Sequence, residues 1–240
     1  MIGNARALRA AVRLDLRLQR RYGFYHAAAF SAVLWMAVLF VLPDSVLGVA
    51  MPYVIFGDLA IVGFFFIAGA VFFEKGERTV FALLITPLRF GDYLAAKLIT
   101  LTALSVAVSV VVTLVDYGTG FNGPALLIAV VLISLLLLLS GLISATPFPS
   151  ISEWLLPSTG VIAVLSLPLI HYSGLWPHPV FYAIPTQGPM QLLGWAFGQI
   201  PMTTWQVVYA VAYPVVWIAV LSLAAPRMFD RYVVAREGSS

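Results

Sequence analysis

The chain lacks cysteine altogether and carries little charge. Without cysteine there can be no disulfide and no thiolate metal site, and the redox compartment cannot be read from the sequence. Charged residues make up 10% of the 240 residues, whereas soluble domains average about 25%. Hydrophobic residues reach 62%, and a soluble protein of this length could not bury that much apolar surface. The composition therefore predicts an all-α integral membrane protein that crosses the bilayer several times.

Several enzyme signatures are also missing. The chain has no G-x-x-x-x-G-K-S/T phosphate loop, so it cannot bind ATP by that route, and it has neither H-E-x-x-H nor G-x-S-x-G. His171 and His178 lie near one another in sequence, but a metal site needs three or four converging ligands. We therefore predict no catalytic residue, no metal ligand and no cofactor on this chain. Its basic residues indicate membrane topology rather than nucleic acid.

Arginines dominate residues 4–21. They follow one another at steps of three or four, which places them on one arc of a helix, with Leu8, Val12, Leu16 and Leu18 outside it. This pattern predicts an amphipathic helix at the membrane surface, where anionic lipid attracts each basic residue by about 1 kcal/mol. The alternative is a topology signal with no other role. The arginines of this arc are Arg6, Arg9, Arg13, Arg17 and Arg20.

Six apolar segments follow, each close to the ~20 residues that span hydrocarbon. They are predicted at residues 24–43, 51–73, 94–115, 124–145, 155–172 and 205–225, within a single transmembrane domain covering residues 1–240. Residues 44–50 and 116–123 are expected to be short outer turns. The apolar, proline-rich connection 173–204 predicts a short re-entrant or interfacial helix around 188–197.

Basic residues set the predicted orientation. With the N-terminus inside, the inner segments hold 6 Lys or Arg before the first span, 4 in 74–97 and 3 after residue 225, which accounts for all 13. The positive-inside rule then puts both termini and residues 74–97 in the cytoplasm.

Asp58 is the one ionisable residue well inside a predicted span, roughly 10 Å below its outer end. Because an embedded aspartate is costly, it should line a translocation path, bond to a neighbouring helix or reach back to the interface. Thr102, Ser105 and Ser109 share one face of the third span. Such hydroxyls favour close helix packing over a pathway-lining role, which stays open.

A polar stretch at 74–97 interrupts the apolar segments. It holds seven charged residues: Glu74, Lys75, Glu77, Arg78, Arg89, Asp92 and Lys97. Residues 80–85 have helical apolar spacing, and Thr86-Pro87 then breaks the helix, because proline lacks an N–H and disfavours α geometry before it. The stretch predicts a short amphipathic helix held at the membrane face.

The order of these features resembles the ABC-2 type permeases, the membrane subunits of bacterial ATP-driven exporters. Three motifs carry the likeness: Leu83-Leu84-Ile85-Thr86-Pro87, then Tyr93-Leu94-Ala95-Ala96-Lys97, then Phe181-Tyr182-Ala183-Ile184-Pro185-Thr186 before the last span. Where the family commonly has Gly-Thr-Leu-Glu, this chain has Arg78-Thr79-Val80-Phe81. The likeness covers nearly the whole chain and comes nearest to the small drug-export permeases, including the kind assigned to fluoroquinolone efflux.

The resemblance implies a function and partners. Residues 74–92 would be the coupling helix, seated on a separate ABC ATPase subunit that holds ATP and Mg²⁺, and a second permease subunit would complete the pathway. The chain would then lie in the bacterial inner (plasma) membrane and export a small amphipathic molecule. The residues implied at the ATPase contact are Glu74, Glu77, Arg78, Thr79, Phe81, Leu84, Thr86 and Pro87.

Two other functions stay open. The chain could be an ion-coupled secondary transporter that uses Asp58, although its halves show no matched pair of broken helices. It could also be a membrane assembly factor that transports nothing.

Overall fold

The computed structural model describes residues 5–77, 89–229 and 231, and every regular element among them is a helix. The first is α1, Ala5–Arg21, followed by α2, Phe24–Phe40. The two meet at an angle of 64°. Gly23 makes this bend possible because its φ of +77° lies in the left-handed region that glycine adopts at no steric cost.

A long, nearly continuous helical rod follows. It consists of α3 (Asp44–Leu59), the π-helical turn η1 (Ala60–Phe65) and α4 (Phe66–Gly76). The expectation that residues 44–50 form an outer turn is wrong, since α3 begins at Asp44. Pro43 lies just before that helix in extended geometry, and the carboxylate of Asp44 in the first turn favours the positive end of the helix dipole.

The rest of the chain completes a bundle. Its elements are α6 (Phe90–Asp116), α7 (Gly123–Ala145), α8 (Ile151–Ser166), α9 (Pro168–Tyr172), the 3₁₀ turn η2 (Pro179–Ala183), α10 (Gln187–Ala196) and α11 (Thr204–Phe229). The short helix expected around 188–197 corresponds to α10. Its re-entrant or interfacial position in a membrane stays a prediction.

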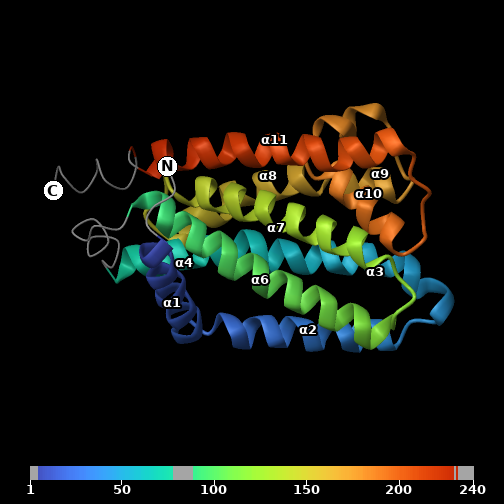
Figure 1. Ribbon diagram of the computed structural model, residues 1–240, viewed down its shortest axis with the longest axis horizontal. Helices are drawn as coiled ribbons and strands as arrows, with labels where there is room; N and C mark the ends of the chain where they lie inside the picture. The colour runs from blue at the N-terminus through green and yellow to red at the C-terminus, as the bar shows by residue number, and fades with distance from the viewer. Residues whose placement is uncertain (1–4, 78–88, 230, 232–240) are drawn as a thin grey trace.

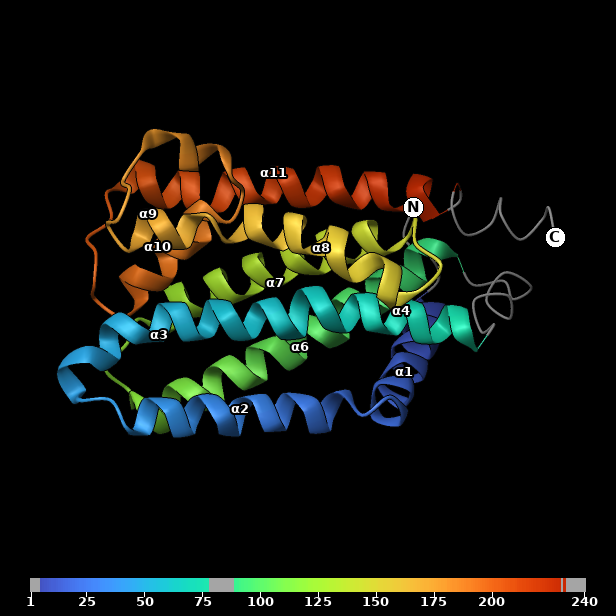
Figure 2. The same ribbon diagram turned by 180° about the vertical axis from the view of Figure 1, so that it is seen from behind.

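The long helices run side by side, as Figures 1 and 2 show. Helix α1 crosses one end of the bundle, and α9, η2 and α10 lie at the other. We call these the α1 end and the α10 end. The C-terminal end of α4, the N-terminal end of α6 and the C-terminal end of α11 all lie at the α1 end.

Helix α7 runs through the middle of the bundle and packs against η1, α6, α10 and α11. Its approach to η1 depends on Gly141, because a Cβ there would lie 2.5 Å from the carbonyl oxygen of Phe64. Gly188 likewise lets α10 approach α11, where a Cβ would lie 2.5 Å from the Cα of Ala210. Both contacts bring backbones closer than any side chain would permit.

The outer helices leave large apolar side chains exposed. Phe30 on α2, Leu156 on α8 and Leu223 on α11 are 70%, 80% and 68% exposed. Within the described ranges, five helical segments are long and apolar enough to cross a membrane, and the count reaches six if α1 and α2 form one bent span. The predicted fold class, an all-helical protein with several membrane-spanning helices, is confirmed.

Candidate functional site

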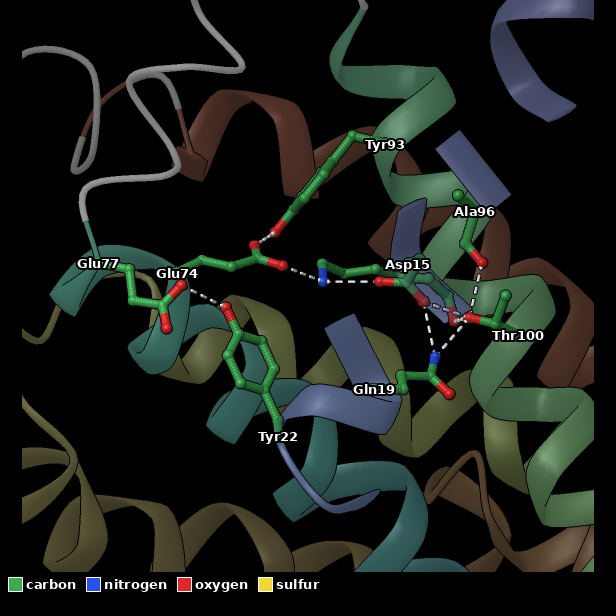
Figure 3. A network of polar contacts seen from close by, with 9 residues as sticks. Asp15, Gln19, Tyr22, Glu74, Glu77, Tyr93, Ala96 and Thr100 are labelled. Carbon is green, nitrogen blue, oxygen red and sulfur yellow. Dashed lines mark hydrogen bonds and ion pairs between the residues drawn. The ribbon is translucent and has the colours of Figure 1, made fainter. Parts of the chain in front are cut away.

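The α1 end holds an ion pair buried between three helices. The Lys97 ammonium on α6 lies 2.6 Å from Oε1 of Glu74 on α4 and 3.0 Å from Oδ1 of Asp15 on α1. Lys97, Glu74 and Asp15 are 2%, 1% and 6% exposed. Because a charge removed from water needs a partner of opposite sign, these three side chains hold α1, α4 and α6 in one arrangement. Figure 3 shows this cluster, in which the carboxylates of Glu74 and Asp15 point toward one another.

Three neutral side chains complete what we call the buried ion-pair cluster. The Tyr93 hydroxyl donates to Oε2 of Glu74 over 2.6 Å. The Gln19 amide donates to Oδ2 of Asp15 over 2.6 Å and to Oγ1 of Thr100 over 2.7 Å, and the Thr100 hydroxyl is hydrogen-bonded to Asp15 as well. Every carboxylate oxygen of the cluster therefore has a donor, the condition under which buried charges are tolerated.

A more exposed pair lies at the edge of the cluster. Arg21 lies 2.9 Å from Oε1 of Glu77, and the Tyr22 hydroxyl donates to Oε2 of Glu77 over 3.2 Å. Burial, followed by the nearby carboxylates of Glu74 and Glu77, raises the pKa of the Tyr22 phenol to about 12. The phenol therefore remains a hydrogen-bond donor at neutral pH, and it ties the turn after α1 to the end of α4.

Lys75, the neighbour of Glu74, reaches in another direction. Its ammonium donates to the carbonyl oxygens of Ala145, Thr146 and Phe148 over 3.3, 2.9 and 2.9 Å. These carbonyls lie at the C-terminal end of α7 and just beyond it, where helical C=O groups lack partners and a cation complements the helix dipole. Two consecutive residues of α4 thus connect it to α1 and α6 on one side and to α7 on the other.

The cavity beside the cluster is too small for a drug-like molecule. It measures about 20 Å³ and is bordered by residues of α1, α4 and α6, among them Asp15, Glu74 and Tyr93. That volume is close to what one water needs. The arrangement is therefore a joint between helices rather than a catalytic or ligand-binding pocket. Among the described residues, no group of three or more His, Asp or Glu side chains is placed to hold a metal ion.

The structure describes two of the residues implied at the ATPase contact. Glu74 faces the interior of the bundle and belongs to the buried ion-pair cluster, so in this arrangement it holds helices together instead of presenting a contact surface. Glu77 lies at the edge, where its side chain is 31% exposed. The others, Arg78, Thr79, Phe81, Leu84, Thr86 and Pro87, lie outside the described residues.

Asp58 is deeper than the sequence suggested. Since α3 begins at Asp44, Asp58 lies about 20 Å along the helix from its start. It is 3% exposed, and its Oδ1 accepts a hydrogen bond of 2.5 Å from the Ser31 hydroxyl of α2. This is the geometry of the structural alternative, a hydrogen bond to a neighbouring helix, whereas a pathway-lining role for Asp58 stays a prediction.

Three hydroxyl residues of α6, Thr102, Ser105 and Ser109, do not line a common cavity. Ser105 and Ser109 are buried at 0% and 2% exposure. Thr102 borders a hollow of about 670 Å³ beside α6, whose other lining residues are apolar side chains of α6 and Leu135 of α7. Burial of the two serines agrees with the packing interpretation, whereas a pathway-lining role for Thr102 stays a prediction.

Sequence reasoning missed the cluster itself, above all Asp15, Gln19 and Thr100. A signal was present, because Asp15 and Gln19 lie one turn apart on the helix face opposite the arginine arc. A polar pair on the face turned toward the bundle predicts a buried partner. Tyr93, Lys97 and Thr100 repeat at steps of four and three on α6 and supply that partner.

The fold defines a multi-pass membrane protein without a nucleotide-binding motif. The family model of the fluoroquinolones export permease proteins matches residues 6–237, so the chain belongs to that family. Two relatives are the fluoroquinolones export permease proteins of Mycobacterium tuberculosis strains CDC 1551 / Oshkosh and ATCC 25618 / H37Rv. Each is 53% identical over 229 residues, covering 95% of this chain and 97% of the relative. No solved structure matches the chain.

Proposed function

We propose that this chain is the membrane-spanning subunit of an ATP-driven exporter, and that it carries fluoroquinolone-like drugs out of the cell. The names of its relatives supply the substrate class, because both are fluoroquinolones export permease proteins. The absence of a phosphate loop from the sequence supports an energy source on another chain. ATP and Mg²⁺ would therefore bind a separate ABC ATPase, and a second permease subunit would complete the pathway.

In this proposal the α1 end faces the cytoplasm of a bacterial cell and the α10 end faces outward. Arginines of α1, together with Lys75, Lys97 and Arg227, belong to elements that reach the α1 end. The sequence has no Lys or Arg between residues 22 and 74 or between 98 and 226, the segments that include the α10 end. Basic residues are retained on the cytoplasmic side, which supports this orientation.

The observation that carries the coupling mechanism is the connection made at the end of α4. Glu74 is paired with Lys97, and Lys75 with the carbonyls that follow α7. The chain then continues into residues 78–88, the part of the predicted coupling helix outside the described residues. An ATPase that displaces this segment would therefore pull on α1, α6 and α7 together.

The test separates binding of the ATPase from drug transport. The chain is co-expressed with the ABC ATPase encoded beside it, and ATPase pull-down and fluoroquinolone efflux are measured in parallel. Deleting residues 77–85 should abolish both. Phe30→Leu, at an exposed position of α2, is the control and should leave both unchanged. Unaltered pull-down and efflux in the deletion variant would refute the proposal.

Energy coupling is tested separately from substrate. Collapsing the proton gradient while ATP is maintained should leave efflux intact, whereas depleting ATP should stop it. The opposite result would favour an ion-coupled transporter, with Asp58 as the first residue to substitute.

A further inference from the structure

Helix α11 carries four aromatic side chains spaced four residues apart. They are Trp205, Tyr209, Tyr213 and Trp217. A step of four residues advances about 6 Å along a helix, so successive rings become neighbours. The ring centroids of Tyr209 and Tyr213 are 5.5 Å apart, and those of Tyr213 and Trp217 are 6.5 Å apart. Tyr182 of η2 lies 5.3 Å from Tyr209 and 6.5 Å from Trp205. We call these five residues the aromatic ladder.

Two hydrogen bonds fix the central rings. The Tyr209 hydroxyl donates to the carbonyl oxygen of Tyr182 over 2.6 Å, and the Tyr213 hydroxyl donates to that of Ala183 over 2.8 Å. Because both tyrosine hydroxyls already donate to backbone carbonyls, a ligand would contact these side chains through their aromatic rings. The two tryptophans remain open, with Trp205 60% and Trp217 36% exposed.

A membrane-interface belt does not account for the whole ladder. Tryptophan and tyrosine collect at the level of the lipid headgroups. Trp205 meets that description, because it adjoins Thr204, where α11 begins at the α10 end. Trp217 lies about 20 Å further along the helix, at the depth of the hydrocarbon. Rings that continue to that depth need another explanation.

A second group of rings extends the ladder at the α10 end. His171 of α9 lies 5.7 Å from Tyr182, and Trp176 lies 5.6 Å from Phe181. Aromatic side chains therefore continue from the middle of α11, through η2, to the loop between α9 and η2. The series connects the depth of the bilayer with its surface.

We propose that the aromatic ladder is a contact surface for planar aromatic drug molecules that cross the half of the membrane nearest the α10 end. This inference rests on the proposed function, the export of fluoroquinolone-like drugs. A fused aromatic ring system can stack on successive rings of the ladder. An amine cation on the same molecule is attracted electrostatically to the faces of these rings. Because each ring resembles the next, a molecule could move along the ladder without losing its contacts.

The experiment measures drug binding directly, without the ATPase. The full chain is purified in lipid nanodiscs and its affinity for a fluoroquinolone is measured by equilibrium dialysis. Trp217→Leu and Tyr213→Leu should each weaken binding about two- to tenfold, the range expected for one aromatic contact. Trp217→Phe, which retains a ring, should keep most of the affinity. Phe30→Leu on α2 removes an exposed ring outside the ladder and should change nothing.

Trp205→Leu is a third ladder variant that removes a ring, and because Trp205 is largely exposed its loss should weaken binding with little effect on the fold. Equal affinity in the wild-type chain and all ladder variants would overturn the ladder and leave the proposed function standing. No binding to the wild-type chain would overturn the substrate class as well. Unchanged drug binding with loss of a two-copy assembly, measured by native mass spectrometry, would assign the surface to a second copy and also refute the proposal.

Discussion

Replacing Lys97 by methionine removes one ammonium from between two carboxylates and keeps a side chain of similar length. Lys97 is 2% exposed and lies within 3.0 Å of both Glu74 and Asp15. Removing one partner of a buried ion pair costs about 3–5 kcal/mol, because the remaining charges stay buried without compensation. Against a total stability of about 5–15 kcal/mol, that is a large fraction.

The loss is measured as a change in unfolding of the purified chain in detergent. For a chain of this length, 1 kcal/mol corresponds to about 2–4 °C, so the midpoint of Lys97→Met should fall by about 6–20 °C. Arg21→Met is the matched control. It removes a cation from Glu77 in the same region, but the arginine side chain is 66% exposed. An exposed pair contributes about 0–1 kcal/mol, so Arg21→Met should fall by no more than about 4 °C.

A triple variant isolates the charge effect. Combining Lys97→Met with Glu74→Gln and Asp15→Asn removes all three charges together, so no charge stays buried without a partner. Most of the lost stability should return. Equal losses in Lys97→Met and Arg21→Met, or no recovery in the triple variant, would refute the assignment of this cluster as a helix contact held by buried charges.

Two further substitutions test positions away from the cluster. Gly141→Ala should destabilise the chain by about 1–3 kcal/mol, because its Cβ would meet the Phe64 carbonyl oxygen at 2.5 Å. The control is Gly160→Ala on α8, whose Cβ would meet nothing within 4 Å. In the same unfolding assay it should be neutral or slightly stabilising. Asp58→Asn keeps an acceptor for the Ser31 hydroxyl and should retain efflux, and Asp58→Leu should lower stability by about 1–3 kcal/mol. Loss of efflux in a stable Asp58→Asn protein would instead favour a role in transport.

The helices were predictable because apolar runs of this length have few alternatives. The runs now assigned to α7 and α11 are apolar on every face, so length alone marked them as spans. The second span begins at Asp44 and not at the predicted residue 51, so the residues expected to form an outer turn belong to α3. Pro52 does not end this helix, because a membrane-spanning helix tolerates a proline in its interior, and Pro52 lies within α3.

The cluster was less predictable, because its members come from distant parts of the chain. Asp15 is separated from Lys97 by 82 residues, and Glu74 from Lys97 by 23. Periodicity tells which face of its own helix a residue occupies, but not which helix lies opposite. The family resemblance implies that Glu74 lies at the ATPase contact, whereas in the structure it faces inward, where Lys97 and Tyr93 are its partners.

This inward turn changes how residues 74–77 can act. Glu74 and Lys75 are adjacent, yet one contacts α6 and the other the chain after α7, so the end of α4 is held on two sides. Glu77, one turn after Glu74, is held by Arg21 through an exposed pair, which is easier to break. A partner that engages the chain beyond Glu77 would first separate this outer pair, and the buried pairs would then move with α4 as a unit. Under the proposed function, we therefore expect the exposed contacts of this stretch to determine whether an ATPase binds and the buried ones to determine whether that binding moves the bundle.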